Sequence, residues 1–173
     1  LYSSAASDVY KRQGTDTMSD IRKRAIAGLK AGDSFTLVRT FTEDETLSFG
    51  EISRDQNPVH YSDEFAQAKN LQGKICHGLL VGGMITEVGG QIGWLASGMN
   101  FRFRRPVYFG DTVTCVFTIT EVDARNRARA EAVLSNQHGE PVIEATLTGV
   151  LPGPKEQQLM SAMISEERTT SAG

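Results

Sequence analysis

The most hydrophobic stretch of the chain, residues 75–88, limits the possible folds more than any other feature. It is apolar on nearly all sides and runs on towards residue 95, and a helix of that kind is buried rather than at the surface. Each glycine inside a helix costs roughly 1 kcal/mol relative to alanine, so close backbone approach must compensate. The glycines of this region are Gly78, Gly82, Gly83, Gly89, Gly90 and Gly93. We therefore expect a buried helix with a sheet pressed against its first turns and a break or bend at residues 89–90.

After this helix, the sequence pattern changes to that of β-strands. Residues 99–107 alternate, with Phe101 and Phe103 on one face, and the alternation stops at Pro106. The segments that follow are rich in β-branched or apolar residues and are separated by short polar turns. They are residues 112–120, 128–134 and 141–151. Strands joined by such short turns predict an antiparallel meander of all four segments.

The part of the chain before the buried helix supplies one more strand and two short helices. Residues 34–41 alternate apolar and polar side chains, which predicts a strand. Thr42 and Glu45 have the spacing of a capping box and predict a helix that ends near Ser53. Ser62 precedes acidic and apolar residues and predicts the start of a second short helix.

These elements fit one domain. A chain of 173 residues can fill one hydrophobic core but not two. A buried helix combined with antiparallel strands predicts an α+β fold, in which an antiparallel sheet wraps around its own central helix. We expect this domain to span residues 18–152. Residues 1–17 read as a non-native or disordered leader, and residues 153–173 as a polar tail with one short helix around residues 158–164.

Charge and composition exclude several partners. The net charge is −3 and there is no long basic run, which argues against nucleic acid or an anionic membrane as a partner. No stretch approaches the length of apolar sequence that spans a bilayer. Cys76 and Cys115 form no CxxC pair, which favours a reducing, cytoplasmic setting. His60, His77 and His138 are scattered, so we predict no metal site.

A short segment between the two upstream helices carries the chemistry. Residues 53–60 read Ser-Arg-Asp-Gln-Asn-Pro-Val-His, and Pro58 steers Asn57 away from the helical region, so the segment should form a rigid turn. That turn can direct Asp55 and His60 at one point, where a carboxylate and an imidazole can share a water and move protons. The same residues also suit an ordinary turn in which Asx side chains bond their own backbone.

Three features together resemble the MaoC-like (R)-specific enoyl-CoA hydratases: this segment, His77 and Gly78 at the start of the buried helix, and the strand with residues 103–107 that leads to Gly110 and Asp111. The resemblance spans residues 31–151 and implies the hot-dog fold. The family signature is Ser/Thr-Gly-Asp-x-Asn-Pro-Leu/Ile/Val-His, with Ala or Ser six residues later. The matching residues are Ser53, Asp55, Asn57, Pro58, Val59, His60 and Ala66. Arg54 stands where the family has glycine, which raises the question of the local backbone, because glycine adopts conformations that arginine avoids.

The resemblance implies the reversible syn addition of water to a trans-2-enoyl-CoA, which gives an (R)-3-hydroxyacyl-CoA. Asp55 and His60 would hold the water, and the N–H of Gly78 would stabilise the negative charge on the thioester oxygen. The residues expected to bind substrate or shape the site are Asn57, His77, Thr86, Arg104 and Arg105. The two arginines suit the phosphates of coenzyme A and equally suit a solvated strand face. No cofactor is implied.

The same family leaves alternatives open. A 3-hydroxyacyl dehydratase of fatty-acid synthesis uses the same machinery on an acyl-carrier-protein thioester, and a non-catalytic hot-dog subunit would only support a partner. We expect a homodimer, because a sheet edge and a flank of the central helix need cover. The acyl chain length stays open, with Leu80, Met84 and Trp94 as candidates for the end of the acyl tunnel.

Overall fold

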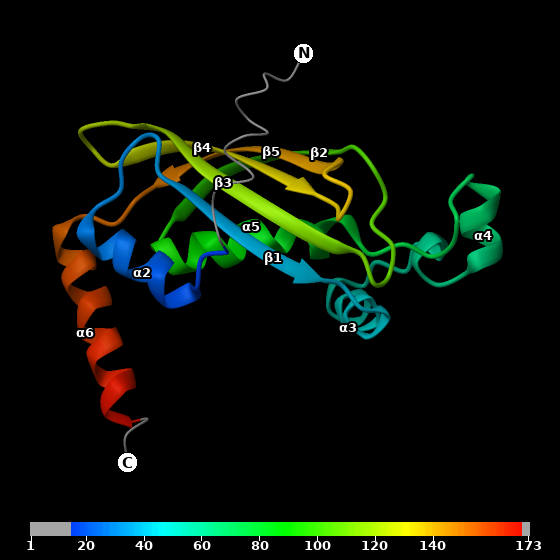
Figure 1. Ribbon diagram of the computed structural model, residues 1–173, viewed down its shortest axis with the longest axis horizontal. Coiled ribbons are helices and arrows are strands. Elements are labelled where there is room, and N and C mark those ends of the chain that lie inside the picture. Colours follow the sequence, from blue (N-terminus) through cyan, green and yellow to red (C-terminus); the bar gives the residue numbers. More distant parts are fainter. Residues whose placement is uncertain (1–14, 171–173) are drawn as a thin grey trace.

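The computed structural model describes residues 15–170, with side chains as far as Ile164. A single antiparallel sheet of five strands lies over one central helix, in the order β1-β3-β4-β5-β2 (Figure 1). The strands are β1 (Ser34–Thr40), β2 (Leu95–Phe103), β3 (Thr112–Val122), β4 (Arg127–Ser135) and β5 (Pro141–Val150). The α+β class and the sheet around a central helix are confirmed.

The order of the strands corrects the expected meander. Strands β3, β4 and β5 do follow one another as hairpins, but β2 pairs with β5 on the far side, with Phe101 opposite Ala145. Strand β1 instead occupies the side of β3 that β2 was expected to take, with Leu37 opposite Cys115. Turn residues indicate where a strand stops, but they do not determine which strand lies next to it.

The central helix α5 (Gly78–Ile92) is pressed against the sheet at its first turns, as expected. A Cβ atom at Gly78 would lie 2.6 Å from the ring of Phe103, and one at Gly82 would lie 3.0 Å from the ring of Phe101. A side chain at Gly78 would force the ring of Phe103 to move, so glycine keeps the helix this close to strand β2. The side of α5 that faces the core is almost fully buried and consists of Val81, Gly82, Met84, Ile85, Val88 and Ile92.

The expected break at residues 89–90 is wrong, because α5 continues to Ile92 and ends at Gly93. Gly93 has φ +68°, in the left-handed region that glycine adopts without penalty. Arg22 also stabilises the last turn, since its Nε donates to the carbonyl of Gln91 at 2.7 Å. A tertiary contact thus satisfies carbonyls that the isolated helix end would leave free.

Helices α3 (Glu43–Ser53) and α4 (Asp63–Ala68), with the 3-10 turn η1 (Pro58–His60) between them, lie together at one end of the molecule (Figure 1). The capping box of α3 is confirmed, because Thr42 and Glu45 each accept a hydrogen bond from the backbone of the other. The cap of α4 is confirmed too, with the side chain of Ser62 accepting from the amide of Phe65.

Helices α2 (Met18–Ala27) and α6 (Pro154–Thr170) lie at the opposite end (Figure 1). Helix α2 was not predicted, and α6 is longer than the short helix expected around residues 158–164. Ile21 and Ala25 of α2 and Met160 of α6 belong to the main core. Among residues 15–170, no helix combines the length and the apolar character needed to cross a membrane.

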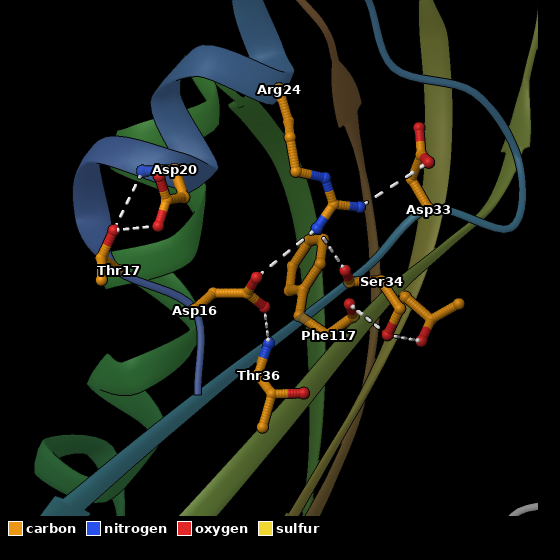
Figure 2. Close-up of polar contacts among 9 residues, drawn as sticks. Asp16, Thr17, Asp20, Arg24, Asp33, Ser34, Thr36 and Phe117 are labelled. Carbon is orange, nitrogen blue, oxygen red and sulfur yellow. Dashed lines mark hydrogen bonds and ion pairs between the residues drawn. The ribbon is translucent and has the colours of Figure 1, made fainter. Parts of the chain in front are cut away.

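Polar contacts attach α2 and the residue before its cap to the outer edge of β1 (Figure 2). Asp16 donates its N–H to the carbonyl of Thr36 at 2.8 Å and accepts from the N–H of Thr36 at 2.6 Å. Arg24 donates to the carbonyl of Ser34 at 2.9 Å and lies 3.7 Å from the carboxylate of Asp33. These groups occupy edge positions that another strand could otherwise bind. Of the expected leader, residues 1–14 lie outside the described part of the chain.

Candidate active site

The turn that follows α3 has the left-handed backbone that the family glycine would supply. Arg54 caps the helix with φ 59° and ψ 22°. Its side chain is exposed, so the arginine is accommodated without a steric clash in the core. The turn therefore keeps the left-handed backbone although arginine stands at the family's glycine position, and arginine is strained in that conformation.

We predict that Arg54→Gly stabilises the protein by about 0.5 to 1 kcal/mol. Glycine removes the strain of the left-handed backbone, but it also raises the conformational entropy of the unfolded chain, which offsets part of the gain. Chemical denaturation measures the gain. Asn126→Gly is the matched control, since Asn126 also has φ 59° but asparagine tolerates this region, so its gain should be close to zero. Equal stability of Arg54→Gly and the wild type would contradict the account.

Residues 55–59 form the expected Asx turns, and only one of the two carboxylate oxygens of Asp55 is used in them. The amide of Asn57 donates to Asp55 Oδ1 at 3.1 Å, and the amide of Val59 donates to Asn57 Oδ1 at 3.3 Å. Asp55 Oδ2 takes no part in the turn and faces His60 Nε2 at 3.9 Å. The two interpretations of this segment are therefore compatible, since the turn holds the side chain that could react.

The tautomer of His60 is set by a carbonyl group. His60 Nδ1 lies 2.8 Å from the carbonyl oxygen of Ile75 and must donate to it, which leaves the lone pair on Nε2. Burial lowers the pKa of His60, although the hydrogen bond to Ile75 opposes the shift. The lowered pKa favours the neutral form of this buried imidazole, in which the lone pair of Nε2 faces Asp55.

His77 and Gly78 complete the site from the other side. The ring of His77 stacks on that of His60, with 3.8 Å between centroids, and its Nε2 donates to the backbone carbonyl of Asp55 at 3.0 Å. Gly78 begins α5, and the N-cap residue His77 makes no side-chain capping bond to the helix. The first amides of α5 thus carry the partial positive charge of a helix N-terminus.

A cavity of about 570 Å³ collects most of the predicted residues. Its polar side chains are those of Asp55, Asn57, His60, His77, Arg104 and Arg105, and Gly78 lies beside them. Its apolar lining includes Val59, Leu71, Ile75, Val81, Val107 and Ile143. Thr86 is not among the lining residues, because it lies on the exposed side of α5 and donates to the carbonyl of Gly83. Leu80, Met84 and Trp94 do not line it either.

The two arginines at this cavity are already engaged. Arg104 donates twice to the carboxylate of Glu144, at 2.8 and 2.6 Å. Arg105 donates to the carbonyl of Pro141 at 2.9 Å and lies 3.5 Å from Glu140. A role in phosphate binding would therefore require these contacts to be shared or broken.

Asp55, His60 and His77 offer ligand atoms within 4.8 Å of one another, which raises the question of a cation. His60 Nδ1 and His77 Nε2 each donate a hydrogen bond, so the free lone pairs lie on His60 Nε2 and His77 Nδ1. His77 Nδ1 is buried and has no hydrogen-bond partner among the described residues. The two rings are stacked at an angle of 28°. Because lone pairs lie in the ring planes, stacked rings cannot both point at one ion without strain.

Cys76 also lines the cavity, directly before His77. Burial raises the pKa of its thiol to about 11, so the thiol is protonated at neutral pH and is a poor nucleophile. Cys76 is therefore a buried structural residue of the cavity wall and not a nucleophile.

With this geometry known, comparisons with other proteins identify the family. The sequence model of the family described as MaoC like domain matches residues 29–140. The chain belongs to the MaoC-like family. It is 30% identical to the (R)-specific enoyl-CoA hydratase of Rhodospirillum rubrum over 128 residues, which cover 72% of this chain and 89% of that protein.

Other MaoC-like relatives point the same way. The mitochondrial 3-hydroxyacyl-[acyl-carrier-protein] dehydratase of Arabidopsis thaliana is 28% identical over 72% of this chain and 78% of its own length. The unliganded R-hydratase PhaJ1 of Pseudomonas aeruginosa superposes with a TM-score of 0.67 at 27% identity, over 73% of this chain and 84% of that one. The hot-dog fold is confirmed, and the chain is a hydro-lyase of the hydratase and dehydratase type.

Proposed function

We propose that this MaoC-like protein is an (R)-specific enoyl-CoA hydratase. The observation that carries the proposal is the placement of Asp55 Oδ2 and His60 Nε2, 3.9 Å apart, in the same cavity as the open N-terminus of α5. Their separation is too long for a direct hydrogen bond, but one water can donate a hydrogen to each acceptor. A water held in this way has its oxygen free to attack.

The reaction follows from these positions. The water oxygen bonds to the β-carbon of the enoyl thioester while one of the two acceptors, Asp55 or His60, takes its proton. The pair then delivers a proton to the α-carbon, and because both groups lie on one side of the substrate, the addition is syn. The negative charge that builds on the thioester oxygen is stabilised by the N–H of Gly78 and the helix dipole. No cofactor enters these steps.

The test is hydration of crotonyl-CoA and of a long-chain enoyl-CoA by the purified chain. We expect the absorbance of the conjugated thioester to fall and chiral analysis to return the (R)-3-hydroxyacyl product. An (S) product, or no turnover of either thioester, would reject the proposal.

A dehydratase acting on acyl-carrier-protein thioesters is the second candidate, and the Arabidopsis relative supports it. The same assay distinguishes the two, with crotonyl-CoA compared against crotonyl-acyl-carrier protein. A higher kcat/KM for the carrier-protein thioester would favour the dehydratase. A non-catalytic subunit is disfavoured because the chain retains both Asp55 and His60.

We also propose a homodimer that joins two β2 strands. Among the described residues, no strand pairs with the outer edge of β2. Large apolar side chains are exposed along β2 and on the adjacent part of α5, namely Leu79, Leu95, Met99 and Phe103. The opposite edge, on β1, is occupied by Asp16 and Arg24. The sheet can therefore extend across β2 in a closed, two-fold contact.

A further inference from the structure

The backbone carbonyl of Asp55 accepts two side-chain hydrogen bonds. One comes from His77 Nε2 at 3.0 Å, and the other from the hydroxyl of Tyr61 at 3.1 Å. The rings of Tyr61 and His77 meet edge to face, with 6.0 Å between centroids. Two donors from different parts of the fold thus hold the main chain of Asp55. Tyr61 directly follows η1, and His77 directly precedes α5.

Helix α3 shapes the space in which these donors meet. A Cβ atom at Gly50 would lie 1.8 Å from the hydroxyl oxygen of Tyr61 and 3.3 Å from Cε1 of His77. Phe49, the neighbour of Gly50, packs against the His77 ring with 5.2 Å between centroids. Any side chain at position 50 would therefore displace the Tyr61 hydroxyl. Glycine at this position gives the hydroxyl access to the carbonyl of Asp55.

The direction of the Asp55 carboxylate depends on this anchor. The side chain of Asp55 is half exposed. Its Oδ1 accepts from the amide of Asn57, and its own N–H donates to Ser53 Oγ at 3.2 Å. Fixing the carbonyl as well sets the rotation of the peptide planes on both sides of its Cα. Tyr61 is not among the residues that line the cavity, so it acts on Asp55 from behind rather than on the substrate.

We propose that Tyr61 is a positioning residue for Asp55, and that Gly50 is the residue that admits the Tyr61 hydroxyl to the Asp55 carbonyl. This inference rests on the proposed hydratase function for its kinetic test but not for its structural one. Nothing in the sequence indicates it, because the contact joins a side chain to a carbonyl six residues earlier through a turn.

The first test is Tyr61→Phe, which removes only the hydroxyl. We expect kcat for crotonyl-CoA hydration to fall about tenfold, the loss that corresponds to one functional hydrogen bond. KM should change less than twofold, because Tyr61 does not contact the substrate. The matched control is Tyr108→Phe. In the wild type, the hydroxyl of Tyr108 accepts from the amide of Gln72 at 3.1 Å. It removes a hydroxyl of the same kind and should leave kcat unchanged.

The second test uses Gly50 in a double-mutant cycle. Gly50→Ala alone should lower kcat about as much as Tyr61→Phe, because the new methyl group displaces the hydroxyl. In the Tyr61→Phe background the hydroxyl is gone, and the nearest ring atom, Cζ, lies 3.1 Å away. Gly50→Ala should then lower kcat less than twofold further. Additive losses, or an unchanged kcat in Tyr61→Phe, would overturn the proposal.

A third measurement does not depend on activity. The amide of Asn57 donates to the Asp55 carboxylate, so its hydrogen exchange reports how firmly the turn is held. We expect exchange at this amide to be severalfold faster in Tyr61→Phe than in the wild type or in Tyr108→Phe. If the wild type hydrated no enoyl thioester, the proposed function would fail while this comparison still decided the role of Tyr61. Equal exchange in the three proteins would overturn that role.

Discussion

Asp55→Asn is expected to lower kcat for hydration of crotonyl-CoA by about three orders of magnitude. The amide oxygen of the new side chain can still accept from the N–H of Asn57, which now bonds Asp55 Oδ1, so the turn should be retained. The amide nitrogen then faces the lone pair of His60 Nε2, where Asp55 Oδ2 lies at 3.9 Å. A donor in this place blocks the base and cannot take a proton from water. The measurement is steady-state kinetics with crotonyl-CoA.

Asp44→Asn is the matched control, since it makes the same chemical change at an exposed position in the first turn of α3. It should lower stability by less than about 1 kcal/mol through the helix dipole and leave kcat unchanged. Circular dichroism should show the same fold for both variants. Turnover by Asp55→Asn at the wild-type rate would remove Asp55 from the reaction.

The local part of the site was predictable because its residues are close in the sequence. Asp55, Asn57 and His60 are placed by one turn, and the restriction that Pro58 puts on the preceding residue is visible in the letters alone. The tautomer of His60 was not predictable, since the carbonyl that sets it belongs to Ile75, 15 positions away. A backbone carbonyl leaves no mark in the sequence.

The fold shows the same division between local and long-range information. The caps at Thr42 and Ser62 were predicted correctly, because a cap involves residues three positions apart. The pairing of β2 with β5 was missed, since it depends on which edge of the sheet remains open after β1 has joined β3. Helix α2 did carry a local signal, the Thr17 cap and buried Ile21, but its run of basic residues obscured that pattern.

The position of Thr86 illustrates a limit of a resemblance. Thr86 was expected at the site because the family places a small hydroxyl residue there, yet its side chain lies on the exposed side of α5 and bonds the carbonyl of Gly83. That exposed side is continuous with Leu79, one of the apolar residues of the proposed dimer surface. Within the single chain, Thr86 therefore lies away from the cavity, on the surface that the proposed dimer would cover.

Met99→Arg is expected to convert the protein from a dimer to a monomer. Met99 is the central residue of β2, which spans residues 95–103, and it lies opposite Leu147 on the face of the sheet that α5 covers. When two β2 strands pair antiparallel over their full length about a two-fold axis, their central residues meet, so one substitution introduces two like charges at the centre of the interface. Burying unpaired charges costs several kcal/mol, which raises Kd at least a thousandfold.

Sedimentation velocity over a range of concentrations measures this change, and Val38→Arg is the control. Val38 is as exposed as Met99, at 46% against 40%, but it lies on β1, the edge strand that Asp16 and Arg24 occupy, so the variant should remain a dimer. A wild-type monomer, or a Met99→Arg dimer, would contradict the proposed contact. Because the covered edge and the open edge belong to the same sheet, this comparison tests the assignment of the interface to β2 and not merely the effect of an added charge.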